Sequence, residues 1–221
     1  MLHGFLPSLL EGAGVTLSVA FSSLAGALVL GLIGALAKLS RSRIARSMAQ
    51  VYTTVIRGVP DLILLMLVFY GGQVGVNALA TALDHDPIDV DPWLAGVLSI
   101  AFIFGAYMTE VFRGAFMAVP SGQREAGVAF GMTPLQVLRR ITLPQMLRHA
   151  LPGLSNNWLV MIKSTAIVSV IGLSDLMTRG GQAAGATREP FSFYLAVALI
   201  YLAFTSLSEL MFATLKRRLS P

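Results

Sequence analysis

The sequence predicts an all-α integral membrane protein with five transmembrane helices, and three observations lead to this fold class. The 221 residues are 55% hydrophobic and only 12% charged, with a mean hydropathy of +0.74. Apolar stretches long enough to span a bilayer recur along the chain, and basic residues gather in alternate loops between them. A soluble domain carries about a quarter charged residues, so the composition argues against a soluble enzyme, a disordered chain and a free nucleic-acid-binding protein. The absence of cysteine also excludes structural disulfides and thiolate metal sites.

A membrane helix needs about 20 mostly apolar residues, and each expected span contains an apolar run of at least that length. We place the spans at about residues 15–37, 48–80, 93–119, 151–173 and 191–215. The first is an anchored helix and not a cleaved signal peptide, because its basic cluster follows the apolar run. The second is interrupted by Arg57-Gly58-Val59-Pro60-Asp61, where the glycine and the proline weaken a helix.

The charges of the loops predict the orientation in the membrane. The loops after the first and third spans and the C-terminal tail carry the basic residues Lys38, Arg41, Arg43, Arg46, Arg124, Arg139, Arg140, Arg148, Lys216, Arg217 and Arg218. The loop after the second span carries Asp84, Asp86, Asp89 and Asp91 and no lysine or arginine. Because lysine and arginine concentrate in cytoplasmic loops, we expect an outside N-terminus and a cytoplasmic C-terminus.

Charged residues also lie inside the expected spans, namely Asp61, Glu110, Arg113 and Lys163. A charge at the bilayer centre costs about 3 kcal/mol on insertion scales. Glu110 and Arg113 are three residues apart and can pair on one helical face, and Lys163 can meet an acid from another span. Such charges either form buried pairs that fix helix positions or build a polar site or gate on a transport path, and both interpretations stay open.

Asp61 differs from the other intramembrane charges because it directly follows the break in the second span. A broken helix at membrane depth is tolerated where protein or a water-filled cavity satisfies the freed backbone groups, and transport sites use such breaks. Asp61 therefore belongs to a substrate path, caps the helix that restarts after Pro60, or pairs with Arg57.

The first span carries a stripe of small residues, each four apart: Ser23, Ala27, Gly31 and Ala35. Small residues let helix backbones approach closely in lipid. We expect this stripe to pack within the chain, and a contact with another subunit is the alternative.

The cytoplasmic loop at about residues 120–149 reads as two short helices joined at a glycine. Ser121 can begin the first helix and Gly131 can end it. Thr133 and Gln136 form a capping box for the second, with Pro134 at its first position. The joint exposes Phe130, Met132 and Leu135, and an exposed apolar knuckle predicts a partner.

The same loop resembles the "EAA" loop of ABC importer permeases. That pattern is EAA, three residues, G, nine residues and I-x-LP, and every spacing is met here by Glu125, Ala126, Gly127, Gly131, Met132, Ile141, Leu143 and Pro144. The one departure is Gly127, which stands where the family usually has alanine. The resemblance implies that this loop docks on an ATPase.

Other segments resemble the polar amino-acid permeases, so the resemblance covers nearly the whole chain. Arg57-Gly58-Val59-Pro60 is similar to their RGTP element, and residues 106–114 are similar to AYxxExxRG. The resemblance is closest to the permeases of histidine/lysine/arginine/ornithine and opine-type uptake systems. It implies a single transmembrane domain over residues 1–221 with the type I importer (MetI-like) permease fold, in the bacterial inner membrane. It also implies a second related permease chain in a hetero- or homodimer, two cytoplasmic ABC ATPases that bind ATP-Mg, and a periplasmic amino-acid-binding protein.

The chain lacks the motifs of an enzyme. A P-loop needs a lysine after glycine, and none of Lys38, Lys163 and Lys216 follows one. There is no HExxH motif, and the three histidines are scattered. We therefore expect no intrinsic catalysis, no bound metal and no cofactor on this chain. The rival from another class is a self-sufficient ion-driven carrier or channel.

The expected substrate path comprises the charged residues in and beside the spans: Asp61, Glu110, Arg57, Arg113 and Lys163. A carboxylate beside the path attracts a cationic side chain, most strongly where water is scarce. The hypothesis is that Asp61 favours arginine, lysine, histidine or ornithine, while glutamine, glutamate and opines remain alternatives.

Overall fold

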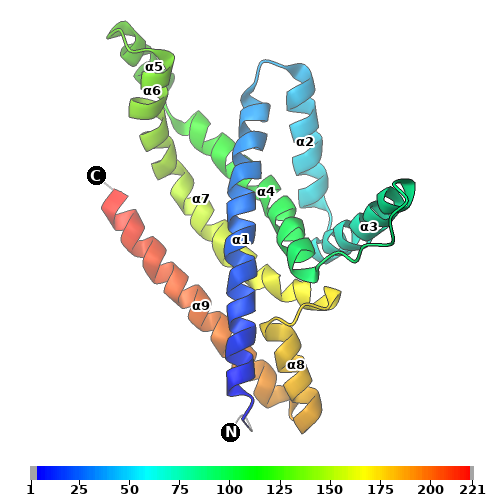
Figure 1. Cartoon of the computed structure of the whole chain (residues 1–221). Coiled ribbons are helices and arrows are strands. Elements are labelled where there is room, and N and C mark those ends of the chain that lie inside the picture. The colour runs from blue at the N-terminus through cyan, green and yellow to red at the C-terminus, as the bar shows by residue number, and fades with distance from the viewer. Residues whose placement is uncertain (1–3, 220–221) are drawn as a thin grey trace.

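The computed structural model describes residues 4–219, and all of its regular structure is helical (Figure 1). The elements are α1 (Leu6–Leu39), α2 (Arg43–Gly58), α3 (Asp61–Ala82), α4 (Pro92–Ala118), α5 (Ser121–Ala129), α6 (Pro134–Val137), η1 (Leu138–Thr142), α7 (Leu143–Ser164), η2 (Thr165–Ile171), α8 (Leu176–Thr187) and α9 (Pro190–Leu219). Five segments of the described chain are long and apolar enough to cross a membrane, at Leu6–Leu39, Asp61–Ala82, Pro92–Ala118, Pro134–Ile171 and Pro190–Arg217. The expected fold class is therefore confirmed.

The core of the molecule is the contact between α1 and α4, which pack against each other over most of their lengths (Figure 1). Ser23, Ala27, Gly31 and Ala35 are all buried. A Cβ added to Gly31 would lie 2.4 Å from Cβ of Met108, so the two backbones pack as closely as the missing side chain permits. The expectation that this stripe packs within the chain is confirmed.

The second span, expected at 48–80 with an interruption at Arg57–Asp61, forms two separate helices, so the predicted break is confirmed and the spanning part is shorter than expected. Helix α2 ends at Gly58, Val59 is extended, and Pro60 holds φ at −57° before α3 begins at Asp61. Only α3 is apolar enough to count as a span. Helix α2 is amphipathic instead, with an exposed apolar face that carries Ile44, Met48, Val51 and Val55.

The fourth span is longer than expected, because the loop before it continues into it. Helix α5 ends near Gly131, which has φ of +77°, and the capping box of Thr133 and Gln136 begins α6. The chain then passes through the π-helical turn η1 into α7 without a break. The second of the two predicted short helices is therefore the first turns of the span itself. Ser121 does not cap α5 with its side chain, since Pro120 occupies that position.

Helices α4 and α7 run antiparallel, and glycines set their register. Gly153 of α7 lies against Val111, and Gly96 of α4 lies against Val168, just beyond α7. The outer face of α7 is anchored on α9 by a hydrogen bond of 2.9 Å from Trp158 Nε1 to Ser208 Oγ. A smaller apolar cluster, with Leu9, Leu176 and Phe193, joins α1, α8 and α9 at the other end of the molecule.

Candidate functional site

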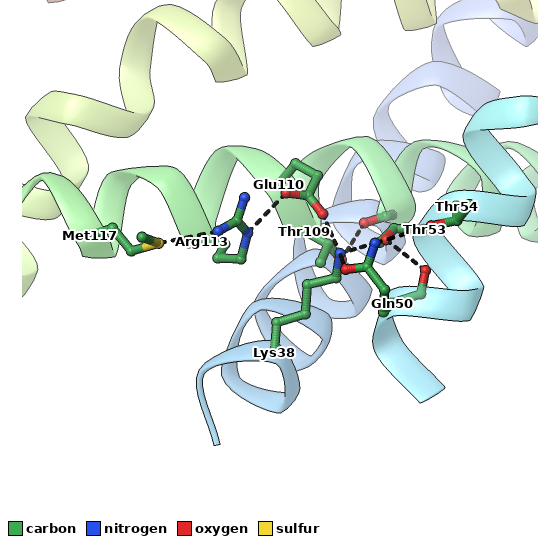
Figure 2. Close-up of polar contacts among 9 residues, drawn as sticks. Lys38, Gln50, Thr53, Thr54, Thr109, Glu110, Arg113 and Met117 are labelled. Carbon is green, nitrogen blue, oxygen red and sulfur yellow. Dashed lines mark hydrogen bonds and ion pairs between the residues drawn. The ribbon is translucent and has the colours of Figure 1, made fainter. Parts of the chain in front are cut away.

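Three charged side chains from two helices form one network beside the α1–α4 contact (Figure 2). Glu110 of α4 pairs through Oε1 with Nζ of Lys38 on α1, and its Oε2 accepts a hydrogen bond of 2.9 Å from Nε of Arg113. Lys38 Nζ also donates to Thr53 Oγ1 at 2.6 Å and to Gln50 Oε1 at 2.9 Å, both on α2. The predicted pairing of Glu110 with Arg113 is confirmed, and the network ties α1, α2 and α4 together.

Lys38 is the member of this network that sequence reasoning missed, because we assigned it to a cytoplasmic loop. The helix α1 extends to Leu39, so Lys38 is still helical. It lies seven residues beyond Gly31 and four beyond Gly34, on the face that packs against α4. This spacing is the sequence feature that could have placed Lys38 on the packing face of α1. The Lys38 side chain is only 6% exposed, against 20% for Glu110.

A polar cavity of about 490 Å³ lies between α2 and α4, beside the network. Its lining residues are Gln50, Thr53, Thr54, Arg57, Gly58, Tyr107, Glu110 and Arg113. The guanidinium carbon of Arg57 lies 5.5 Å from the centre of the Tyr107 ring, which is a cation–π contact. The structure thus brings together three of the five residues expected on the substrate path.

Asp61 lies next to this cavity without lining it. It is half-buried at the first position of α3, four residues after Arg57, which lines the cavity. It makes no side-chain cap of α3. Among the described residues it has no ion pair, and Arg57 stacks on Tyr107 instead, so neither the capping nor the pairing alternative is realised.

Lys163 is not brought to the cavity. Its side chain is exposed near the end of α7, and none of the ion pairs in the described part of the chain includes it. The predicted pairing with an acid from another span of this chain is therefore not found.

The loop that carries the EAA pattern presents one exposed apolar joint. Phe130 is 87% exposed, and Leu135 and Val128 are exposed beside it. A shallow pocket of about 500 Å³ is lined by Ser121, Arg124, Glu125, Val128 and Ala129 on α5. Met132, expected to be exposed, is half-buried, with its sulfur facing Gly127.

Packing accounts for the departure at Gly127. A Cβ added there would lie 2.6 Å from Cδ1 of Ile141 and 3.1 Å from Cγ2 of Val137. The side chains of η1 and α6 therefore occupy the space that an alanine methyl group would need. Within the residues that the structure describes, no group of three or more His, Asp or Glu side chains is placed to hold a metal ion.

Comparisons with known proteins agree with these features. Residues 27–221 match the family described as "Binding-protein-dependent transport system inner membrane component". The chain is 50% identical over 220 residues to the histidine/lysine/arginine/ornithine transport system permease protein HisQ of Salmonella typhimurium, covering 100% of this chain and 96% of that protein. It is 40% identical to the octopine transport system permease protein OccQ of Rhizobium radiobacter, covering 98% and 94%.

Solved structures show the same architecture. The crystal structure of an amino acid ABC transporter with histidines has a TM-score of 0.81 at 32% identity, covering 96% of this chain and 94% of that one. The MetNI methionine ABC transporter in an inward-facing conformation has a TM-score of 0.78 at 20% identity, covering both chains fully. The second likeness concerns the fold alone.

Proposed function

Because the chain belongs to the family of binding-protein-dependent transport system inner membrane components, we propose that it is the permease subunit of an ATP-driven importer of cationic amino acids. In this proposal, residues 1–221 form one transmembrane domain in the bacterial inner membrane, with the C-terminus in the cytoplasm. A second permease chain completes the pore, a periplasmic binding protein delivers the amino acid, and two cytoplasmic ATPases bind ATP-Mg and hydrolyse it. The observation that carries the proposal is the charged polar cavity between α2 and α4, in a chain 50% identical to a histidine/lysine/arginine/ornithine permease.

The chemistry of the cavity suits an amino acid. Glu110 is neutralised by Lys38 and Arg113, whereas Arg57 has no ion pair in the described part of the chain. Every amino acid carries a carboxylate, and the planar guanidinium of Arg57 can bind it with two hydrogen bonds. Asp61, at the first position of α3 and without an ion pair among the described residues, offers a carboxylate to a cationic side chain.

Uptake of labelled arginine into proteoliposomes tests this function. The vesicles contain this chain with the permease, ATPase and binding protein encoded beside it, and ATP is enclosed on the ATPase side. We expect uptake that requires every partner and ATP, and that excess lysine or histidine suppresses while glutamate does not. Uptake by this chain alone without ATP would show a self-sufficient carrier and overturn the proposal.

Asp61→Asn tests the role of the carboxylate within the same vesicles. We expect arginine uptake to fall about tenfold or more, since a hydrogen bond to a charged group is worth about 1.5–3 kcal/mol and about 1.4 kcal/mol corresponds to a factor of ten. Asp61→Glu, which keeps the charge, is the matched control and should retain more uptake. ATPase activity stimulated by the binding protein reports whether the variant complex still assembles. Unchanged arginine uptake by the Asn variant would remove Asp61 from the path.

Uptake of opines is the second candidate function, and the 40% identity to an octopine permease favours it. An opine also carries an amino-acid carboxylate, so Arg57 would serve both substrates. Competition separates the two functions: labelled octopine transported in the presence of excess arginine would favour opine uptake, and the reverse result would favour the cationic amino acids.

A further inference from the structure

Arg57 has a carboxylate on each side of it. Asp61 follows it by four residues, at the first position of α3. On the other side, Lys38 binds both Glu110 of α4 and Thr53 of α2. Thr53 precedes Arg57 by four residues and lies about 6 Å from it along α2, at a rise of about 1.5 Å per residue. An amino acid whose carboxylate binds Arg57 could therefore extend a cationic side chain toward either Asp61 or Glu110.

The two carboxylates differ in how far their charge is compensated. Glu110 lines the cavity, but its Oε1 pairs with Nζ of Lys38 and its Oε2 accepts the 2.9 Å hydrogen bond from Nε of Arg113 (Figure 2). A carboxylate with a cation on each oxygen attracts a further cation only weakly, because the local net charge is no longer negative. Asp61 makes no side-chain cap and has no ion pair among the described residues, so its oxygens remain open to a ligand.

Lys38 is fixed behind the wall of the cavity. Its side chain is 6% exposed and is not part of the cavity lining, so its ammonium group does not meet a bound amino acid directly. An ammonium group carries three donors. Each donor has an acceptor here, namely Glu110 Oε1, Thr53 Oγ1 at 2.6 Å and Gln50 Oε1 at 2.9 Å. Acceptors on α2 and α4 thus hold the ammonium group in place, and it acts on the cavity through Glu110.

We propose that Lys38 is a positioning residue for the substrate of this cavity: by neutralising Glu110, it makes Asp61 the carboxylate to which a cationic side chain turns. The proposal rests on the amino-acid transport proposed above. Removal of the ammonium group would free Glu110 Oε1 and give the side chain a second carboxylate on the opposite side of Arg57. A cationic amino acid held in that second orientation would leave the cavity more slowly. An amino acid with a neutral side chain would not be affected in this way.

Two substrates in the same vesicles test this role. Arginine stays cationic, whereas the histidine side chain is cationic at about pH 5.5 and neutral at about pH 8, on either side of its pKa of about 6.5. Uptake of each labelled amino acid is measured in the proteoliposomes described above, with saturating binding protein and with wild type or Lys38→Met. At the higher pH, we expect Lys38→Met to lower arginine uptake about tenfold more than histidine uptake, which is the effect of one hydrogen bond to a charged group. At the lower pH, the two losses should be similar.

The comparison of two substrates cancels any loss of folded complex, because the same vesicles transport both. Lys38→Arg keeps the cation and is the matched control, so it should retain the wild-type ratio of arginine to histidine uptake. Lys38→Met combined with Glu110→Gln removes the freed carboxylate and should restore that ratio. Gln50→Glu keeps Lys38 and is used if Lys38→Met does not assemble. It adds a carboxylate on the Glu110 side of Arg57 and should also lower the ratio at the higher pH; an unchanged ratio would overturn the proposal.

Two other results would overturn the proposal. Equal losses of arginine and histidine uptake at the higher pH would show that Lys38 only joins helices. A double variant whose uptake ratio stays as low as that of Lys38→Met would show that Glu110 does not capture the cationic side chain. Failure of the transport function is recognised separately, because wild-type vesicles would then take up neither amino acid.

Discussion

The network of Lys38, Glu110 and Arg113 permits a quantitative prediction, and Lys38→Met is the sharpest perturbation of it. Methionine keeps the apolar stem of the lysine and removes only the ammonium group. Glu110 Oε1 would lose its partner on α1, while Oε2 would keep Nε of Arg113. On α2, Gln50 and Thr53 would lose the donor that now binds both of them.

The expected cost follows from burial. Breaking a fully buried ion pair by removing one partner costs about 3–5 kcal/mol. Here the Lys38 side chain is 6% exposed, but Glu110 is 20% exposed and keeps Arg113 as a second cation. Water and Arg113 therefore offset part of the lost ion-pair energy. We expect a cost of about 2 kcal/mol, below the range for a fully buried pair. For a chain of this size, 2 kcal/mol lowers the unfolding midpoint by roughly 4–8 °C.

The assay is thermal unfolding of the purified chain in detergent, followed by tryptophan fluorescence. Lys38→Met, Glu110→Gln and the double variant form a cycle that isolates the coupling between the two residues. The double variant should be more stable than the sum of the two losses predicts, by at least about 0.5 kcal/mol, because the second substitution no longer strands a charge. Strict additivity would refute the reasoning, since Lys38 and Glu110 would then contribute independently.

Three further predictions concern other parts of the chain. Gly34→Ala should destabilise the chain by about 1–3 kcal/mol through overpacking, because the added Cβ would lie 2.2 Å from Oγ1 of Thr109; thermal unfolding should show partial recovery on adding Thr109→Ala. Gly131→Asp should reduce co-purification of the ATPase and ATP-driven uptake together, since Gly131 has φ of +77° at the exposed joint; survival of both would exclude docking there. Burial raises the pKa of Asp175, so its protonated carboxyl is favoured in the folded chain over the unfolded chain. This protonation stabilises the fold fully below pH about 3.9, and the stabilisation is lost as the pH rises from there through the raised pKa. Asp175→Asn should flatten the unfolding midpoint over that pH window, and an unchanged slope would contradict the assignment.

The number of spans and the α1 packing stripe could be predicted from the sequence, because both depend on local patterns. Apolar runs mark the spans, and the four-residue spacing of Ser23, Ala27, Gly31 and Ala35 marks a face that another helix can approach. The pairing of Glu110 with Arg113 was predictable for the same reason, since three residues on a helix fix the geometry.

The rest depended on tertiary structure. The spacing from Gly31 and Gly34 could place Lys38 on the packing face of α1, but it could not identify Glu110 as its partner, because that contact joins residues 72 positions apart. The sequence marked the break in the second span, but it did not show that only the half after the break is a span. The polar residues of α2 could not be assigned to a cavity from the sequence, because the cavity forms only where Tyr107 and Glu110 of α4 lie opposite them.

The break between α2 and α3 explains how two unpaired charges can persist beside the cavity. Arg57 lies in the last turn of α2, and Asp61 begins α3. A helix C-terminus stabilises a cation and a helix N-terminus stabilises an anion, so each charge is supported by its own helix. Neither needs the other as a counter-ion, and a direct pair between them is absent from the described structure. Two groups of opposite charge type that do not pair with each other can instead bind the carboxylate and the cationic group of one amino acid. A continuous helix through this segment would have placed Arg57 and Asp61 four residues apart on one face, where they would pair.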